Sequence, residues 1–377
     1  MRILLVNYEY PPLGGGGGVL THTLAVELAK RHSVTVLTTR GAGLPAESFD
    51  QGVHVVRVSV LGRRDLERAS MASLLTFVPA ARRDGAKLVG GAQFDVVHSF
   101  FAVPSGAVGA ALARRATAPH VLTVIGADIF DPSRVSPDRF PPLGAAVRRV
   151  VRGADGVTAI SRDIARRAEQ LTGRAGITVI PCAVEAPGLP ARDRTSLGWA
   201  DGDVVVLTIA RLVARKGLET LVRAVGRAGR PLRLEVVGDG PERPRLEALA
   251  LAEAPGRVAF AGALDGSEKA RRLASADVFA LVSAHEGFGL VYLEAMLAGL
   301  PVLAGTVGGQ TDLLDDERNA LLVPPGDADA AEAALRRLAD DARLRARLAE
   351  AARTTAAAYT PERMAADYLD AYARAAR

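Results

Sequence analysis

Two basic residues in the second half of the chain have the spacing of a diphosphate-binding pair. Arg211 and Lys216 lie five residues apart, directly after the apolar run 204–209, which predicts a buried strand. At the carboxyl end of a strand, a guanidinium fork and an ammonium point charge can converge on one diphosphate. The chain holds only four lysines against 43 arginines, so a lysine at this position carries more weight than any single arginine. The alternative is an ordinary solvated basic turn.

Two carboxylates follow another predicted strand of the same half, 278–282. Glu286 lies in the loop after this strand, and Glu294 lies on a helix that should start near Gly289. One carboxylate can therefore face a ligand from the loop and the other from the helix. The free backbone N–H groups at the helix start, at Gly289 and Leu290, can bind an anion. A glutamate placed there only to complement the helix dipole is the alternative.

Two glycine-rich turns also follow predicted strands. Gly14–Gly18 comes after residues 2–7, and its glycines would let backbone N–H groups approach a phosphate, aided by a helix expected over 19–31. The segment lacks both G-x-G-x-x-G and the Lys-Ser/Thr of a P-loop, so a flexible surface turn is the alternative. The second turn, 306–312, either binds a ligand or is a strand–helix turn that needs a positive φ.

The elements that must position these residues alternate as apolar runs and amphipathic segments, which predicts parallel α/β units. The expected strands of the first half are 2–7, 34–38, 53–58, 95–98, 120–124, 156–160 and 177–180. Those of the second half are 204–209, 232–237, 257–260, 278–282, 301–304 and 320–323, and helices over 328–358 and 362–376 follow.

A Pro/Gly-rich linker, 186–190, separates the two halves. We therefore expect one doubly wound domain from residues 1–186 plus 362–377 and a second from 187–361. Ligands of such sheets bind beyond the carboxyl ends of the strands, which for two facing sheets is the cleft between them.

Composition excludes several classes of protein. The 377 residues include a single cysteine, Cys182, so neither a disulfide scaffold nor a Cys-rich metal site is expected. The first strand begins at once and no run reaches about 20 apolar residues, so neither a signal peptide nor a spanning helix is predicted. We expect a soluble, cytoplasmic protein.

Taken together, these motifs resemble glycosyltransferase family 4, the retaining, nucleotide-sugar-dependent enzymes of GT-B fold. The resemblance rests on the glycine turn Gly14–Gly18, an R-x4-K pair and an E-x7-E pair, in this order. Supporting segments are Gly238–Pro241, Val258–Gly262, Ala276–Phe279 and Tyr368–Tyr372. It implies an α/β fold of two facing Rossmann-like domains, with the acceptor on the first domain and the donor on the second.

The resemblance also implies roles. Arg211 and Lys216 would bind the donor diphosphate, Glu294 the ribose hydroxyls, and Glu286 the donor sugar. The residues implied as catalytic are Arg211, Lys216 and Glu286, and those implied as donor-binding are Gly15, Gly16, Gly17, Gly240, Phe288, Gly289, Leu290 and Glu294. The reaction would be metal-independent and without a cofactor beyond a nucleoside-diphosphate sugar, UDP- or GDP-linked.

The acceptor side is less well defined. Ile125 stands where the family often has a histidine in T-V-H-G-x-D, so an imidazole hydrogen bond to the donor sugar is missing. His98 and Asp128 are the acceptor-side candidates, although a strand-end histidine such as His98 is more often a partly buried structural residue. The expected acceptor is a glycan, a lipid-linked glycan or a small molecule, and no nucleic-acid partner is expected.

Charge favours an anionic partner for the first domain. The net charge is +5. Residues 1–186 have a net charge of +7, and residues 187–377 have a net charge of −2. The segment Arg63–Lys87 combines arginines with apolar residues, which predicts either an amphipathic helix at an anionic membrane surface or a core-packed helix with solvated arginines. The protein would then be peripheral at the inner face of the membrane.

Three other functions remain open. A nucleotide-sugar epimerase or a sugar phosphorylase could share the fold, and a non-catalytic carbohydrate-binding subunit would retain it without chemistry. A nicotinamide-dependent oxidoreductase is disfavoured, because the second strand ends Thr38-Thr39-Arg40 without the acidic residue that would bind a ribose.

Overall fold

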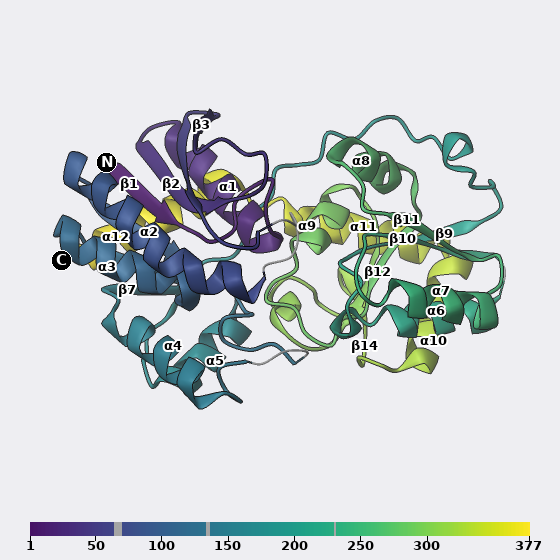
Figure 1. Ribbon diagram of the computed structural model, residues 1–377. Helices are drawn as coiled ribbons and strands as arrows, with labels where there is room; N and C mark the ends of the chain where they lie inside the picture. The colour runs from purple at the N-terminus through teal and green to yellow at the C-terminus, as the bar shows by residue number, and fades with distance from the viewer. Residues whose placement is uncertain (64–69, 133–135, 230) are drawn as a thin grey trace. The chain divides into compact units, whose positions relative to one another are not determined.

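The computed structural model describes residues 1–63, 70–132, 136–229 and 231–377 (Figure 1). The chain divides into two compact units. The first unit is Met1–Val184 with Thr360–Arg377, and the second unit is Glu185–Tyr359. Both chain ends lie in the first unit (Figure 1).

The first unit is built on an eight-stranded sheet of order β3-β4-β2-β1-β5-β6-β7-β8. Its strands are β1 (Arg2–Val6), β2 (Ser33–Arg40), β3 (Glu47–Asp50), β4 (Val53–Ser59), β5 (Val96–Phe100), β6 (His120–Val124), β7 (Gly156–Ala159) and β8 (Thr178–Val179). Every pair is parallel except β3 with β4. β5 and β6 are buried along their whole length, as expected for the centre of a parallel sheet covered by helices on both faces.

Helices cover this sheet. They are α1 (Gly16–Ala29), α2 (Met71–Gly91), α3 (Ala107–Ala116), α4 (Pro141–Gly153), α5 (Arg162–Thr172) and α12 (Pro361–Ala375). The last helix, α12, packs against α1, β6 and β7. A core of side chains from β1, β2, β4, β5, α2 and α3 includes Phe77 and Leu112.

The second unit contains a six-stranded parallel sheet of order β11-β10-β9-β12-β13-β14. Its strands are β9 (Val204–Ile209), β10 (Leu232–Val237), β11 (Val258–Gly262), β12 (Val278–Leu281), β13 (Val302–Gly305) and β14 (Ala320–Val323). Its helices are α6 (Leu218–Ala228), α7 (Arg243–Glu253), α8 (Gly266–Ser275), α9 (Leu290–Leu297), α10 (Ala328–Asp340) and α11 (Ala342–Ala356). The predicted α/β class of both halves is confirmed.

The structure differs from the prediction at one strand that was not expected and at two helices that were. β3 was not expected, because Glu47–Asp50 lacks apolar alternation and pairs only at the sheet edge. The single helix predicted over 328–358 is two helices, because Asp341 is extended and its carboxylate accepts hydrogen bonds from the first turn of α11. The first helix begins at Gly16 rather than at residue 19.

Among the described residues, no helix combines the length and apolarity that crossing a membrane requires.

Candidate functional site

The R-x4-K segment and the E-x7-E segment meet at the carboxyl edge of the second unit's sheet. Lys216 lies on a short 3₁₀ turn, Ala214–Lys216, after β9, and Glu286 lies in the loop after β12. β9 and β12 are neighbouring parallel strands, so these two loops leave the sheet side by side. Lys216 Nζ lies 2.6 Å from Glu286 Oε1, and Ser283 Oγ donates to the same oxygen at 2.6 Å.

Glu286 is held as an anion in a buried position. Its side chain is only 8% exposed, and Arg215 Nη1 lies 3.8 Å from its second oxygen. Burial raises the pKa of Glu286, but the charges of Lys216 and Arg215 and the hydrogen bonds from Lys216 and Ser283 outweigh burial, so the pKa lies below its usual value. The site therefore contains a fixed carboxylate–ammonium pair, and a ligand phosphate can compete for the ammonium.

Arg211 lies at the start of the same loop, half-buried after the end of β9. This loop packs against the turn after β10: Leu212 N–H donates to Asp239 O at 2.9 Å, and Gly240 N–H donates to Asp239 Oδ1 at 2.6 Å. Gly240 therefore lies in the turn that supports the Arg211 loop. Its contact with a donor stays a prediction.

Glu294 lies on α9 and forms an ion pair with Lys269 of α8, with Nζ and Oε1 2.8 Å apart. Both side chains are partly exposed, at 32% for Lys269 and 19% for Glu294. Sequence analysis did not assign Lys269 to the site. The scarcity of lysine was the available signal, since two of the four lysines pair with the two glutamates of E-x7-E.

The start of α9 depends on glycine. Gly289 has φ +98°, and a Cβ there would collide with the ring of Tyr292. The backbone can thus turn from the Glu286 loop directly into the helix, which leaves the first N–H groups of α9 without side-chain caps. Phe288 is buried at the same turn, with its ring against Tyr359.

The glycine turn 306–312 supports the Glu286 loop. Gly308 has the positive φ, +95°, that one of the two interpretations required. Gly309 N–H donates to Glu286 O at 2.8 Å, so the turn after β13 fixes the loop after β12. These hydrogen bonds explain the turn without a ligand.

The glycine-rich turn of the first unit is more helical than predicted. Gly16 and Gly17 belong to the first turn of α1. A Cβ at Gly17 would approach the Phe101 ring to 2.5 Å, so this position requires glycine. The backbone N–H of Gly15 donates to Glu9 Oε2 at 3.2 Å. A carboxylate thus already occupies one of the N–H groups predicted to bind phosphate, a feature that sequence analysis missed.

His98 lies in the core of the first unit. It is fully buried, its Nδ1 is 2.8 Å from Tyr372 Oη of α12, and its Nε2 is 2.7 Å from Thr123 Oγ1. Burial holds the pKa of His98 well below its ordinary value, so the imidazole is neutral. With both ring nitrogens bonded inside the unit, the geometry supports the structural alternative rather than an acceptor contact.

Asp128 organises two loops. Its Oδ2 accepts from Ala102 N–H at 2.7 Å, and its Oδ1 accepts from Ile125 and Gly126 N–H at 3.1 and 2.9 Å. Burial raises the pKa of Asp128, and these backbone hydrogen bonds oppose that rise. Asp128 therefore ties the loop after β6 to the segment after β5, which is a positioning role.

Comparison with known proteins decides the family. Residues 14–186 match the family model described as Glycosyltransferase Family 4, and residues 191–355 match the model described as Glycosyl transferases group 1. This chain belongs to glycosyltransferase family 4. It is a retaining, nucleotide-sugar-dependent hexosyltransferase of GT-B fold, as the sequence predicted.

Relatives of this glycosyltransferase match it along nearly its whole length. A GDP-mannose-dependent alpha-(1-6)-phosphatidylinositol monomannoside mannosyltransferase of Mycolicibacterium smegmatis is 30% identical, covering 93% of this chain and 92% of its own. A D-inositol 3-phosphate glycosyltransferase of Xylanimonas cellulosilytica is 31% identical over 98% of this chain and 94% of its own. Among solved structures, sucrose-phosphate synthase from Thermosynechococcus elongatus has a TM-score of 0.84 at 25% identity, covering 99% of this chain and 98% of its own.

Proposed function

We propose that the second unit binds the nucleoside-diphosphate sugar at the carboxyl edge of its sheet. The observation that carries this proposal is the buried Lys216–Glu286 pair beside the uncapped start of α9. Arg211 and Lys216 bind the diphosphate, and the N–H groups at Phe288, Gly289 and Leu290 add hydrogen-bond donors. Glu294 accepts hydrogen bonds from the ribose hydroxyls.

The mechanism follows from where charge develops. Negative charge grows on the departing β-phosphate while the sugar becomes oxocarbenium-like, so preorganised positive groups lower the barrier. Lys216 and Arg211 supply that potential, and Glu286 holds the Lys216 ammonium in place. The acceptor hydroxyl attacks the face from which the diphosphate leaves, and a phosphate oxygen takes its proton.

GDP-mannose is the first donor to test, because the Mycolicibacterium relative is named for it. Both relatives named above act on compounds in which an inositol carries a phosphate. Together with the +7 charge of residues 1–186, this supports an anionic, lipid-linked or soluble acceptor bound by the first unit.

Nucleotide binding to the full chain tests the donor site. A charge-assisted hydrogen bond is worth about 1.5–3 kcal/mol, so Arg211→Gln should weaken binding of GDP or UDP by about tenfold or more in calorimetry. Glu294→Gln should weaken it too, and 2′,3′-dideoxy nucleotides should lose little further affinity in that variant. Arg353→Gln, which removes an exposed arginine from α11, is the matched control. Unchanged affinity in both site variants would refute the assignment.

The exposed face of α2 supports a membrane contact for the first unit. Met71 and Leu75 are each 70% exposed, and Arg83 and Lys87 continue the same four-residue spacing along the helix. Leu61, 67% exposed, is held beside α2 by the hydrogen bond from its N–H to Thr76 Oγ1. We propose that this face, apolar at one end and basic at the other, lies on an anionic lipid surface.

Other parts of the predicted basic segment do not belong to that face. Phe77 is buried in the core, and Arg63 is buried with its guanidinium over the Tyr8 ring and Nη1 donating to Tyr8 Oη. Residues 64–69, which include Arg64 and Arg68, lie outside the described residues.

Sedimentation with anionic vesicles tests the membrane contact. Each basic residue near such a surface contributes about 1 kcal/mol, so the double variant Arg83→Gln/Lys87→Gln should lose most binding at low salt. Leu75→Ser should weaken binding that remains at higher salt. Arg114→Gln/Arg115→Gln, at the exposed end of α3, is the charge-matched control. Equal sedimentation of all variants would exclude the α2 face.

A further inference from the structure

A second cavity lies in the second unit, apart from the proposed donor site. Its volume is about 740 Å³, and it is formed by one face of α6, the N-terminal parts of α7 and α10, and the loops after β9, β12 and β14. This volume falls in the range of about 300–1,000 Å³ that is typical of small-molecule sites. None of Arg211, Lys216, Glu286 and Glu294 lines it.

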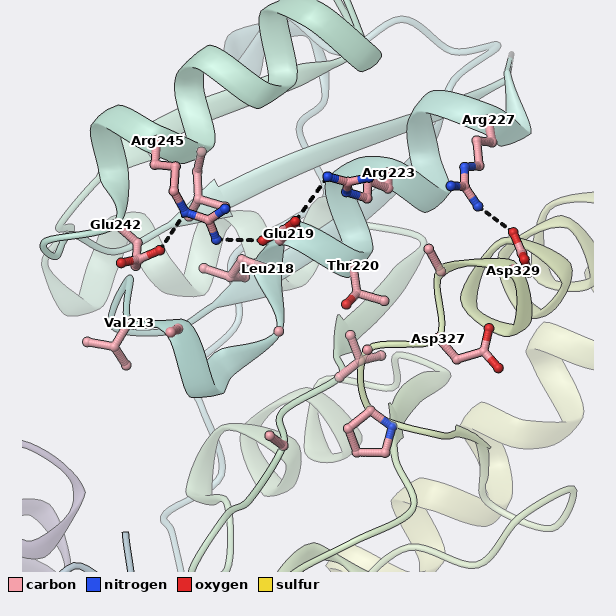
Figure 2. A pocket seen from close by; sticks show the side chains of 18 residues that line it. Val213, Leu218, Glu219, Thr220, Arg223, Arg227, Glu242, Arg245, Asp327 and Asp329 are labelled. Atoms are coloured by element: carbon pink, nitrogen blue, oxygen red, sulfur yellow. Dashed lines mark hydrogen bonds and ion pairs between the residues drawn. The ribbon is translucent and has the colours of Figure 1, made fainter. Parts of the chain in front are cut away.

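Charged side chains of both signs ring this cavity in paired positions (Figure 2). Arg245 lies between two carboxylates, 2.6 Å from Glu219 Oε2 and 2.8 Å from Glu242 Oε2. Arg223 also pairs with Glu219, at 3.1 Å, and Arg227 pairs with Asp329 of α10. The two pairs of Arg245 restrain its guanidinium group, whereas the Arg227–Asp329 pair, 44% and 87% exposed, orders its side chains little.

The signs nearly cancel around the cavity. Three arginines and four carboxylates line it, which leaves a formal charge of −1. A phosphate would face the carboxylates of Glu219, Asp327 and Asp329, and a cation would face the three guanidinium groups. The lining therefore favours neither an inorganic anion nor a polycation.

Thr220 offers a hydroxyl group to this cavity. It lines the cavity from α6 and is only 6% exposed, yet among the described residues its hydroxyl has no hydrogen-bond partner. Figure 2 shows Thr220 between the Arg245–Glu219 pair and the Arg227–Asp329 pair. The Thr220 oxygen is not among the enclosed side-chain atoms that lack a partner, so it is open on the cavity side and a hydroxyl group of a ligand can reach it.

We propose that this cavity binds a neutral saccharide, at a site separate from both the donor and the acceptor. A sugar hydroxyl donates and accepts at once, so it suits a ring in which guanidinium donors alternate with carboxylate acceptors. Leu218 and Leu246 also line the cavity, and each exposes only a small part of its apolar side chain to a ligand. Val213, Ala214 and Gly217 belong to the loop that carries Lys216, so a bound saccharide also braces that loop.

Binding of neutral trisaccharides to the full-length enzyme tests the proposal. Maltotriose and mannotriose are titrated in calorimetry and in saturation-transfer NMR, with inorganic phosphate and spermidine as the charged comparison probes. Ala328→Trp, at the first position of α10, fills the cavity, and Ala342→Trp, at the first position of α11, is the matched control. Thr220→Val removes only the hydroxyl.

We expect at least one trisaccharide to bind the wild type and the Ala342→Trp variant equally. Ala328→Trp should abolish that binding, and Thr220→Val should weaken it about fivefold. No trisaccharide binding by the wild type, equal binding by both tryptophan variants, or binding of phosphate or spermidine in place of sugar would each overturn the proposal. GDP affinity measured on the same samples reports the donor site separately.

Discussion

The two sheets of this glycosyltransferase use their polar residues in different ways. In the first unit, the Asp128 carboxylate accepts hydrogen bonds from three backbone N–H groups. His98 is buried and forms hydrogen bonds with Tyr372 and Thr123. In the second unit, the polar residues beyond the strands pair with other side chains, as Lys216 does with Glu286 and Lys269 with Glu294.

This difference decides which polar residues can serve a ligand. A carboxylate bound to backbone N–H groups cannot leave them without opening two loops, because each buried N–H would lose its partner. An ammonium paired with a carboxylate can accept a phosphate oxygen by a small movement of a flexible side chain. The same fold thus provides a fixed polar frame in one unit and exchangeable ion pairs in the other.

The largest expected effect comes from breaking a buried ion pair of the second unit. Glu286→Gln leaves the Lys216 ammonium without its counter-charge, and the loss of one buried partner costs about 3–5 kcal/mol. Because Lys216 is then no longer held at the departing phosphate, kcat should fall by about 100-fold or more. Glu350→Gln, in an exposed pair with Arg353, should leave kcat unchanged. A kcat within threefold of wild type would show that the pair is only structural.

The matching change in the first unit should separate stability from nucleotide binding. Asp128→Asn removes the charge that accepts three backbone hydrogen bonds, so we expect the free energy of unfolding of the first unit to fall by about 1–3 kcal/mol. Nucleotide affinity, measured by calorimetry on the same protein, should stay the same. A loss of nucleotide affinity equal to that of the donor-site variants would contradict the comparison.

The two units should also lose stability at different acidic pH values. Burial lowers the pKa of His120 to about 4, so His120 is neutral in the folded protein but protonated below about pH 6.5 in the unfolded chain. Its contribution to stability, roughly 3 kcal/mol from this shift, is therefore lost as the pH falls from about 6.5 to about 4. His98, with its lowered pKa, acts in the same direction.

Glu286 of the second unit also resists protonation in the folded protein, but its pKa lies in a lower pH range than the ordinary range of histidine. Because its pKa lies below the usual value, its contribution is present above the usual glutamate range and is lost as the pH falls through the folded pKa. Hydrogen exchange between pH 7 and 5, read separately in peptides from β6 and β12, should therefore show the first unit losing protection first. His120→Gln should flatten this response, and His54→Gln on β4 is the control. Simultaneous loss in both units would contradict the assignment.

The sequence predicted the structure best where one residue type and one spacing determine it. Apolar runs predicted every strand of the second unit, most directly β12 and β13, which are buried along their whole length and apolar throughout. The edge strand β3 was not predicted. Its side chains, Glu47–Asp50, lie outside the core, so the strand has no apolar pattern that a sequence could reveal.

The motifs of the site could be predicted from the sequence, but the side-chain contacts between its residues could not. Spacing placed Lys216 and Glu286 at neighbouring strand ends, but no local pattern shows that Lys269 lies across from Glu294 or that Glu9 reaches Gly15. The first contact depends on how α8 and α9 are placed in the unit, and the second on the conformation of the glycine turn, which neither motif specifies. His98 illustrates the reverse case, because a histidine at a strand end looks accessible until α12, 274 residues away, covers it.

The smallest expected effect concerns Glu9, which makes the glycine turn of the first unit resemble the ion pairs of the second. Its carboxylate accepts from Gly15 N–H at the start of α1, a helix end that otherwise favours an anion. If the predicted donor-binding role of Gly15 is correct, Glu9 competes with the donor phosphate for this N–H. Glu9→Gln keeps an acceptor but removes the charge, so the KM for the nucleotide sugar should fall about threefold, matching a helix-end charge effect of about 0.3–1 kcal/mol. The effect should shrink in high salt, which screens exposed charges.

Glu27→Gln, at the other end of α1 in a pair with Lys30, is the control. A KM that rises in Glu9→Gln would show instead that the carboxylate only holds the glycine turn in shape, and the turn would then belong with the fixed polar frame of the first unit.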